Sequence, residues 1–164
     1  MSNPALFVCL ADESIKFKDD RGSLDVLYES NALVLKRSTS KKGVFRGLHH
    51  QGNSTQHKII RVVSGKIIDF VADVTNTDEV VWYCEIGPED SWVHIDSALA
   101  HGFYALDNVV FEYICDGKYC EDDEQAFCIT SLVKSQLSLK DIIMSPKDAA
   151  GKSFGKVLKS FSRS

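Results

Sequence analysis

The segment KKGVFRGLHHQ, residues 41–51, gathers groups that can bind anions and move protons. Arg46 carries a permanent positive charge, and His49 and His50 carry imidazoles that change protonation near neutral pH. Imidazole is also the commonest metal ligand in proteins. The segment is therefore compatible with a general base, a metal site or an ordinary polar strand surface.

The spacing of these side chains sets a geometric condition, because successive residues of a β-strand face opposite sides of the sheet. Regular alternation places His49 opposite both His50 and Arg46. His49 and Arg46 share a face only if the strand bulges or bends at Gly47. The sequence leaves this question open.

Strand-like segments rich in Val, Ile, Phe and Tyr dominate the first 130 residues and are separated by Gly, Asn, Asp, Ser or Thr clusters. They are LDVLYES, NALVLKR, GVFRGLHHQ, HKIIRVVSGKIIDFVADV, VVWYCEIG, SWVHID, HGFYAL and VVFEYICDG. Short strands at regular spacing predict an all-β sandwich or barrel. Ser64 and Gly65, between two apolar runs, predict a tight hairpin turn.

The C-terminal segment, residues 131–164, is rich in Lys and Ser and predicts one or two short helices. Ser138 is a candidate N-cap for one of them. The final stretch is expected to be loosely ordered or docked on the barrel. Neither an internal repeat nor a linker is evident, so we expect a single domain over residues 1–164.

Composition argues against several classes of function. The net charge is −4 and acidic and basic residues are interleaved, which disfavours nucleic-acid binding and makes any phosphate recognition local. The N-terminus lacks a signal-peptide pattern, and no apolar run approaches the roughly 20 residues that cross a bilayer. The cysteines are odd in number and include no CxxC pair, which suggests neither a disulfide framework nor a cysteine zinc site; they are Cys9, Cys84, Cys115, Cys120 and Cys128. We therefore expect a cytoplasmic protein with reduced thiols.

Five motifs together carry a family resemblance: KKGVFRGLHHQ, QHKIIRVVSGKIIDFVADV, AHGFYAL, FEYICDGKY and LSLKD. In this order they resemble the dTDP-4-dehydrorhamnose 3,5-epimerase family of nucleotide-sugar epimerases, over residues 15–148. The resemblance implies a cupin-type double-stranded β-helix, or jelly roll, with a short helical C-terminal segment. It also implies a homodimer that needs no metal or other cofactor and inverts C3, C5 or both in a nucleoside-diphosphate 4-keto-6-deoxy sugar, for deoxysugar biosynthesis.

Inversion beside a ketone requires a base, a partner for the enolate oxygen, and an acid on the opposite face of the sugar. The resemblance implies that His49 is the base and that Asp141 of LSLKD orients it as a His–Asp dyad. Lys58 corresponds to the lysine near the enolate. Tyr113 corresponds to the proton donor, which begins protonated because the ordinary pKa of tyrosine is near 10.

The resemblance also implies a set of substrate-binding residues. A planar guanidinium suits paired phosphate oxygens, and two arginines match phosphate-binding positions of the family. The full set is Arg46, Arg21, His101, Gln51 and Tyr119.

Two regions depart from the family pattern. Ser23 and Leu24 replace an aromatic pair after DRG, and LVLKRSTS replaces a Q-x-N-H-S-like segment. Both regions help to hold the nucleotide sugar in the family. The resemblance therefore predicts the type of reaction more directly than it predicts which nucleotide or which sugar is bound.

Other functions remain open at this point. A related cupin could act as a nucleotide-sugar 3,4-ketoisomerase, since that reaction also begins with an enolising base. A metal-binding cupin could use imidazoles of His49, His50, His57 and His101, although adjacent histidines point apart on a strand and chelate poorly. A non-catalytic sugar-binding cupin would not need the Tyr113 hydroxyl.

Overall fold

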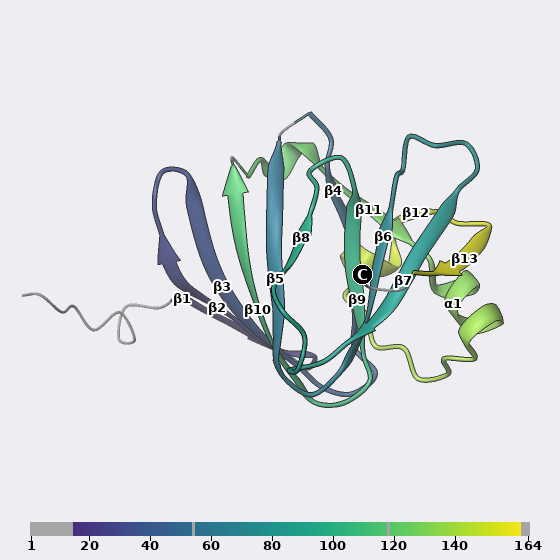
Figure 1. Ribbon diagram of the computed structural model, residues 1–164, viewed down its shortest axis with the longest axis horizontal. Helices are drawn as coiled ribbons and strands as arrows, with labels where there is room; N and C mark the ends of the chain where they lie inside the picture. Colours follow the sequence, from purple (N-terminus) through teal and green to yellow (C-terminus); the bar gives the residue numbers. More distant parts are fainter. Residues whose placement is uncertain (1–14, 54, 118, 162–164) are drawn as a thin grey trace, which may run out of the picture.

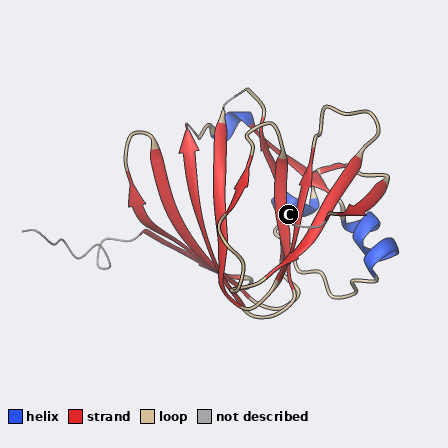
Figure 2. Ribbon diagram, viewed as in Figure 1, coloured by secondary structure: helices blue, strands red, loops and turns tan. Residues whose placement is uncertain are grey.

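The computed structural model describes residues 15–53, 55–117 and 119–161, which form two β-sheets flanked by short helices (Figures 1 and 2). Cys9 and the N-terminal segment expected to lack a signal peptide lie outside these residues. The strands are β1 Ile15–Asp19, β2 Gly22–Glu29, β3 Leu33–Ser40, β4 Phe45–Gln51, β5 Gln56–Ser64, β6 Ile67–Ala72, β7 Val80–Ile86, β8 Val93–Ile95, β9 Ala100–Ala105, β10 Val109–Gly117, β11 Glu124–Cys128, β12 Lys152–Ser153 and β13 Val157–Ser160. The helices are α1 Thr130–Leu137 and α2 Pro146–Ala149, and a 3-10 turn, η2, covers Glu121–Asp123.

The sheets bring together strands that are distant in the sequence. The six-stranded sheet has the order β1-β2-β3-β10-β5-β8, and the seven-stranded sheet has the order β12-β11-β4-β9-β6-β7-β13. Their inner faces meet in a core where the rings of Phe103 and Phe111 lie 4.6 Å apart between centroids. The predicted all-β class and jelly-roll architecture are confirmed.

A second apolar core packs against the seven-stranded sheet. It joins Phe45 and Leu48 of β4 to Leu132 and Val133 of α1. Strand β9 is buried along its whole length because it contributes to both cores. The central strands of this sheet are therefore held rigidly from both sides.

The predicted hairpin at Ser64 and Gly65 is wrong, although the strand–turn–strand pattern is confirmed. Strand β5 pairs with β10 and β8, whereas β6 pairs with β7 and β9. The turn instead carries the chain from one sheet to the other. Gly65 has a φ of +77°, and a Cβ there would lie 2.5 Å from the Asn108 carbonyl oxygen. Glycine is needed at this corner for both reasons.

One or two short helices were expected in the C-terminal segment and two are present, but Ser138 begins neither of them. Ser138 has a φ of +56° and ends α1. The N-cap of α2 is Ser145, whose Oγ accepts a hydrogen bond from the Asp148 backbone N–H at 3.0 Å. Pro146 follows in the first turn, where its missing N–H costs nothing.

The end of the described chain docks on the barrel, since β13 pairs in parallel with β7. Across the described residues, neither helix has the length and apolar character that a membrane crossing requires.

Candidate active site

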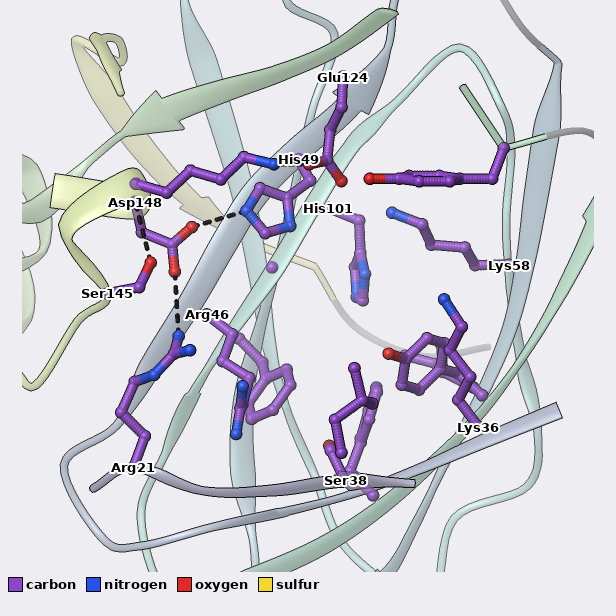
Figure 3. Close-up of a pocket in the computed structure, with 18 residues that line it drawn as sticks. Arg21, Lys36, Ser38, Arg46, His49, Lys58, His101, Glu124, Ser145 and Asp148 are labelled. Atoms are coloured by element: carbon purple, nitrogen blue, oxygen red, sulfur yellow. Dashed lines mark hydrogen bonds and ion pairs between the residues drawn. The ribbon is translucent and has the colours of Figure 1, made fainter. Parts of the chain in front are cut away.

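A pocket with a volume of about 310 Å³ lies between the two sheets, and Figure 3 shows the side chains around it. The core residues Ile60, Phe103 and Phe111 form part of its wall. Polar lining comes from both sheets and from α2. The seven-stranded sheet supplies Arg46, His49, His101 and Glu124; the six-stranded sheet supplies Lys36, Ser38, Lys58 and Tyr113; α2 supplies Lys147 and Asp148.

Positive charge predominates in this pocket although the chain as a whole has a net charge of −4. The cationic lining residues outnumber the carboxylates Glu124 and Asp148; they are Arg21, Lys36, Arg46, Lys58 and Lys147. This local concentration of cations suits an anionic ligand such as a phosphate ester.

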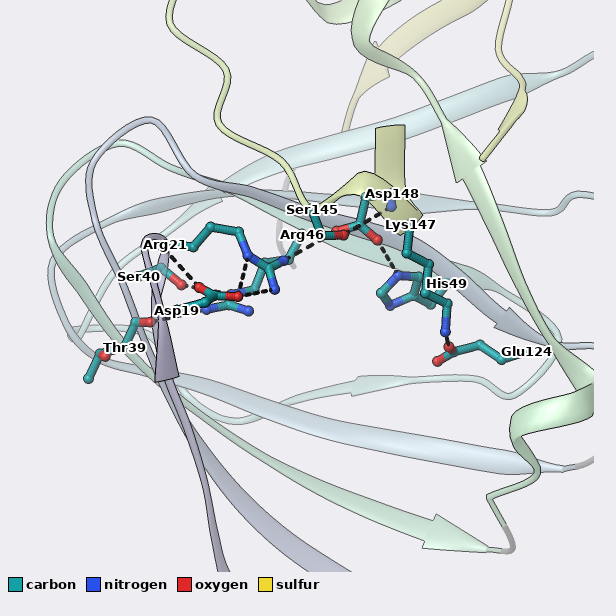
Figure 4. A network of polar contacts seen from close by, with 10 residues as sticks. All are labelled: Asp19, Arg21, Thr39, Ser40, Arg46, His49, Glu124, Ser145, Lys147 and Asp148. Atoms are coloured by element: carbon teal, nitrogen blue, oxygen red, sulfur yellow. Dashed lines mark hydrogen bonds and ion pairs between the residues drawn. The ribbon is translucent and has the colours of Figure 1, made fainter. Parts of the chain in front are cut away.

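His49 and Asp148 form a hydrogen-bonded pair at the edge of the pocket (Figure 4). The His49 Nε2 lies 2.6 Å from the Asp148 Oδ1. Burial alone would raise the pKa of Asp148, but its hydrogen bond to His49, the charge of His49 and the contacts from Ser145 and Arg21 hold that pKa below its usual range. An ionised carboxylate at Nε2 leaves Nδ1 of the imidazole to take a proton from a ligand.

A bulge in β4 turns Arg46 and His49 toward the same pocket. Arg46 is opposite Phe103 of β9 and His49 is opposite His101, so two residues of β4 span the interval that one residue of β9 spans. Gly47 lies in this bulge with a φ of +101°. Arg46 and His49 therefore both face the pocket, which the sequence alone left open. Leu48, between them, packs into the apolar core.

The two arginines at this side of the pocket are held differently. Arg46 donates from Nε to the Ser40 Oγ at 2.9 Å and from Nη2 to the Thr39 carbonyl oxygen at 3.2 Å. Burial, together with the charge of Arg21, lowers the pKa of Arg46. Arg21 donates from Nη2 to the Asp19 carboxylate at 2.6 Å. Much of the charge of Arg21 is therefore neutralised, whereas Arg46 has only neutral hydrogen-bonding partners.

Lys58 and Tyr113 face the pocket from adjacent strands, β5 and β10, of the opposite sheet. Burial lowers the pKa of Lys58, and the nearby charge of Lys36 lowers it further. Burial raises the pKa of Tyr113, an effect that the charge of Arg46 opposes. Lys58 is thus a cation that releases a proton more readily than an exposed lysine, and Tyr113 rests as a neutral phenol.

His101 belongs to a second histidine–aspartate pair in the pocket wall. Its Nε2 lies 2.7 Å from the Oδ1 of Asp69, and both side chains are almost fully buried. The pair joins the neighbouring strands β9 and β6 and fixes the orientation of the ring. His101 lies in the lining of the pocket.

The family model described as dTDP-4-dehydrorhamnose 3,5-epimerase matches residues 9–156. The chain belongs to this epimerase family. A dTDP-4-dehydrorhamnose 3,5-epimerase of Neisseria gonorrhoeae is 32% identical over 130 residues, which cover 75% of this chain and 40% of the relative. Another from Methanothermobacter thermautotrophicus is 30% identical over 118 residues, covering 63% and 64% of the two chains. The chain thus spans less than two thirds of the length of these relatives.

Solved structures of family members share the fold. The dTDP-4-dehydrorhamnose 3,5-epimerase of Sulfolobus tokodaii is 30% identical, with a TM-score of 0.65 over 84% of this chain and 85% of that one. The dTDP-6-deoxy-D-glucose-3,5-epimerase of Legionella pneumophila is 26% identical, with a TM-score of 0.63 over 86% and 85%. The Legionella structure is a complex with dTDP-4-keto-L-rhamnose.

One residue assigned by the family resemblance needs correction. Asp141 does not pair with His49; it lies outside the pocket lining, and its backbone oxygen accepts a hydrogen bond from the Tyr104 hydroxyl at 3.2 Å. The sequence contains the pattern S-x-K-D twice, ending at Asp141 and at Asp148. Pro146 is the sequence signal that distinguishes the second pattern, because proline directly after a serine favours the start of a helix. Asp148 then lies in the first turn of α2.

Gln51 is a second correction, since it also lies outside the pocket lining. Its buried Oε1 accepts a hydrogen bond from the Cys120 backbone N–H at 2.9 Å. This contact anchors the segment that carries Tyr119, which does line the pocket and is 47% exposed. Gln51 therefore supports the pocket indirectly.

Several pocket residues were not found from the sequence. Lys147 of α2 and Glu124 of β11 form an ion pair beside His49, as Figure 4 shows. Neither residue belongs to the five motifs that carry the family resemblance. Lys36 and Ser38 were likewise hidden in LVLKRSTS, a segment noted mainly for its departure from the family pattern.

Proposed function

We propose that this chain is an epimerase that inverts C3, C5 or both of a nucleoside-diphosphate 4-keto-6-deoxy sugar. The observation that carries the proposal is the placement of His49 on one sheet and of Lys58 and Tyr113 on the other, across one cationic pocket. Inversion needs proton removal from one face of the carbon and proton return to the other. Family membership and the dTDP-sugar bound by the Legionella pneumophila relative support the choice of substrate.

The reaction begins at His49. Its imidazole takes the proton from the carbon beside the ketone, and the electron pair of the broken C–H bond moves into the carbonyl to give an enolate. Asp148, held ionised at 2.6 Å, stabilises the imidazolium that forms. Arg21, which lies 3.6 Å from the same carboxylate, helps to keep Asp148 in its charged form.

Lys58 stabilises the enolate oxygen. Among the described residues its ammonium group has no carboxylate within ion-pair distance, so its charge and its N–H donors remain for the ligand. Its lowered pKa brings the acidity of the ammonium closer to that of the enol. A hydrogen bond to the enolate therefore strengthens in the transition state.

Tyr113 completes inversion by donating its hydroxyl proton to the carbon from the opposite face. Its raised pKa keeps the phenol protonated at neutral pH, and an enolate carbon is a far stronger base than a phenolate. The resulting phenolate and imidazolium return to their starting forms by proton exchange with water. No net proton is gained or lost by the enzyme.

The remaining assignments concern binding and assembly. Arg46 and Arg21 bind the diphosphate, His101 shapes the sugar site, and Tyr119 packs against the nucleotide. We also propose that residues 1–164 act as one domain, in a cytoplasmic homodimer, without a metal or other cofactor. A monomer by light scattering would contradict the dimer, and activity lost with a chelator and restored by a divalent ion would contradict the metal-free mechanism.

Deuterium exchange tests the reaction. The protein is incubated in deuterated water with nucleoside-diphosphate 4-keto-6-deoxy sugars carrying different nucleobases, and exchange at C3 and C5 is followed by NMR. We expect exchange and inversion at one or both carbons, abolished by His49→Ala. If deuterium exchange occurs with none of these nucleotide sugars, the proposal is wrong. Migration of the ketone would identify a 3,4-ketoisomerase instead.

A further inference from the structure

The linking segment between α1 and α2, residues 138–145, contains no helix or strand of its own, although it leads to the dyad carboxylate. It joins the sheet through a parallel bridge at Ile143. The Ile143 N–H donates to the Gly43 carbonyl oxygen at 2.9 Å, and the Phe45 N–H donates to the Ile143 carbonyl oxygen at 2.8 Å. This bridge lies at the start of β4, the strand that carries His49. The base and its partner carboxylate are therefore tied together through the backbone as well as directly.

A second anchor of the linking segment lies two residues earlier, at Asp141. Its carbonyl oxygen accepts a hydrogen bond from the Tyr104 hydroxyl at 3.2 Å. Tyr104 lies on β9, is only 6% exposed and packs in the apolar core that covers the seven-stranded sheet. Burial and the charge of Asp141 raise the pKa of Tyr104. The hydroxyl therefore stays protonated and remains a donor at neutral pH.

Gly43 provides the space that the Asp141 carbonyl occupies. Its φ of +87° favours glycine, and a Cβ at this position would lie 2.8 Å from the Asp141 carbonyl oxygen. A side chain at Gly43 would thus displace this carbonyl. The carbonyl depends on two residues, because Tyr104 supplies its hydrogen bond and Gly43 supplies its space.

The linking segment needs two fixed points to place α2. With the bridge at Ile143 alone it could pivot about that residue, whereas a second fixed point at Asp141 also sets its direction. Direction matters because α2 begins at Pro146, three residues after the bridge, and carries Asp148. The Asp148 Oδ1 lies 2.6 Å from the His49 Nε2, and a hydrogen bond weakens steeply when its geometry departs from the ideal.

We propose that Tyr104 and Gly43 are positioning residues for the base of the reaction. By fixing the Asp141 carbonyl they set the direction of the linking segment, and they thereby hold the Asp148 carboxylate at the Nε2 of His49. This role in catalysis rests on the proposed function. Neither Tyr104 nor Gly43 lines the pocket. A change at either residue should therefore slow proton removal without weakening substrate binding.

The tautomer of the His49 imidazole tests the positioning without any substrate. Nitrogen-15 chemical shifts show which ring nitrogen carries the proton, and His49→Ala identifies the signals. At alkaline pH we expect the wild-type ring to carry its proton on Nε2, because Asp148 accepts a hydrogen bond there. Tyr104→Phe removes only the hydroxyl and leaves the ring in the core, and it should populate the Nδ1–H form. Tyr83→Phe is the matched control and should keep the wild-type tautomer, since the Tyr83 ring packs against the same core from β7.

Deuterium exchange adds a kinetic readout. At saturating substrate, Tyr104→Phe should exchange on the order of tenfold more slowly than wild type, which lies between the loss of one neutral hydrogen bond and the effect of a displacement of about 1 Å. KM should be unchanged, since the residues that line the pocket are intact. Gly43→Ala should slow exchange at least as much. The double variant should be no slower than Gly43→Ala alone, because both changes act on the same carbonyl.

An unchanged His49 tautomer in Tyr104→Phe would overturn the proposal, and so would an unchanged exchange rate in an active enzyme. A lower melting temperature with both readouts unchanged would show that Tyr104 only stabilises the core. Rate losses that multiply in the double variant would show two separate routes and would also overturn the proposal. A tautomer shift in Tyr104→Phe, without deuterium exchange by the wild type on any nucleotide sugar, would leave the positioning standing and reject the epimerase function alone.

Discussion

His49 and Asp148 are separated by 99 positions in the chain, yet their Nε2 and Oδ1 atoms lie 2.6 Å apart. His49 stands on β4, at the bulge, and Asp148 stands in the first turn of α2, next to the Ser145 cap. Helix α2 packs against β4 and β11. Asp148 therefore reaches His49 only when the C-terminal segment has docked on these strands. The first prediction follows from this dependence.

Replacing Asp148 by asparagine should slow substrate deuterium exchange by about 10²–10⁴-fold, because the imidazolium loses its charged partner. Asp141→Asn is the matched control and should keep the wild-type exchange rate, since Asp141 lies outside the pocket. Both rates can be followed by NMR. Equal rates in wild type and Asp148→Asn would reject the dyad, and a slow Asp141→Asn would restore the assignment made from the sequence.

Gly47→Ala should disturb the bulge that aligns Arg46 with His49. Gly47 has a φ of +101°, and a Cβ there would lie 2.7 Å from the His101 carbonyl oxygen. We expect a loss of about 2 kcal/mol or more in the free energy of unfolding, measured by urea denaturation. The exchange rate should fall as well, since both pocket residues move. Gly52→Ala, at a position without positive φ, should have a much smaller effect on both measurements.

Tyr113→Phe should separate proton removal from inversion. The base, the dyad carboxylate and Lys58 are untouched, so deuterium should still enter the substrate with its original configuration. Inversion at one or both carbons should fall by about 10²–10⁴-fold, the usual contribution of a positioned acid. NMR can resolve retained from inverted product. Inversion at the wild-type rate would show that another group donates the proton.

Stability at low pH should depend on Glu112, which lies between Arg37 and Arg61 on the outer face of the six-stranded sheet. Burial alone would raise the pKa of Glu112, but the two arginines outweigh it and hold the pKa below the ordinary 4.5. The unfolded chain therefore takes up a proton at higher pH than the folded protein does. The stability that this network contributes is fully present above pH 4.5 and is lost as the pH falls through the folded pKa.

Glu112→Gln should accordingly unfold more easily than wild type at pH 7, by about 1–3 kcal/mol, and the difference should shrink toward pH 3. Urea denaturation at several pH values measures both quantities. The control is Glu85→Gln, which breaks the solvent-exposed pair with Lys66 and should change stability far less than Glu112→Gln does. A difference that grows on acidification would contradict the lowered pKa of Glu112.

The sequence predicted the local elements well because they depend on local patterns. Alternating apolar residues and turn clusters marked the strands that became β2 to β10, and the Lys- and Ser-rich tail was correctly expected to hold short helices. Strands β1 and β11 escaped notice because their sequences, IKFKD and EQAFC, are short and mixed in polarity. The family motifs placed His49, Lys58 and Tyr113, all three of which line the pocket.

Tertiary packing decided those features for which a local sequence pattern is compatible with more than one structure. The turn at Ser64 and Gly65 suits a hairpin or a corner between sheets equally well, and only the partners of β5 and β6 chose the corner. Likewise, the two S-x-K-D patterns are alike as sequences, but only the second is carried by α2 against β4 and brings Asp148 to His49. Residue types and spacing thus determined the strands and the chemistry at hand. Long-range strand pairing, the bulge at Gly47 and the docking of α2 determined which groups meet, because contacts between distant segments are fixed only when the whole core packs.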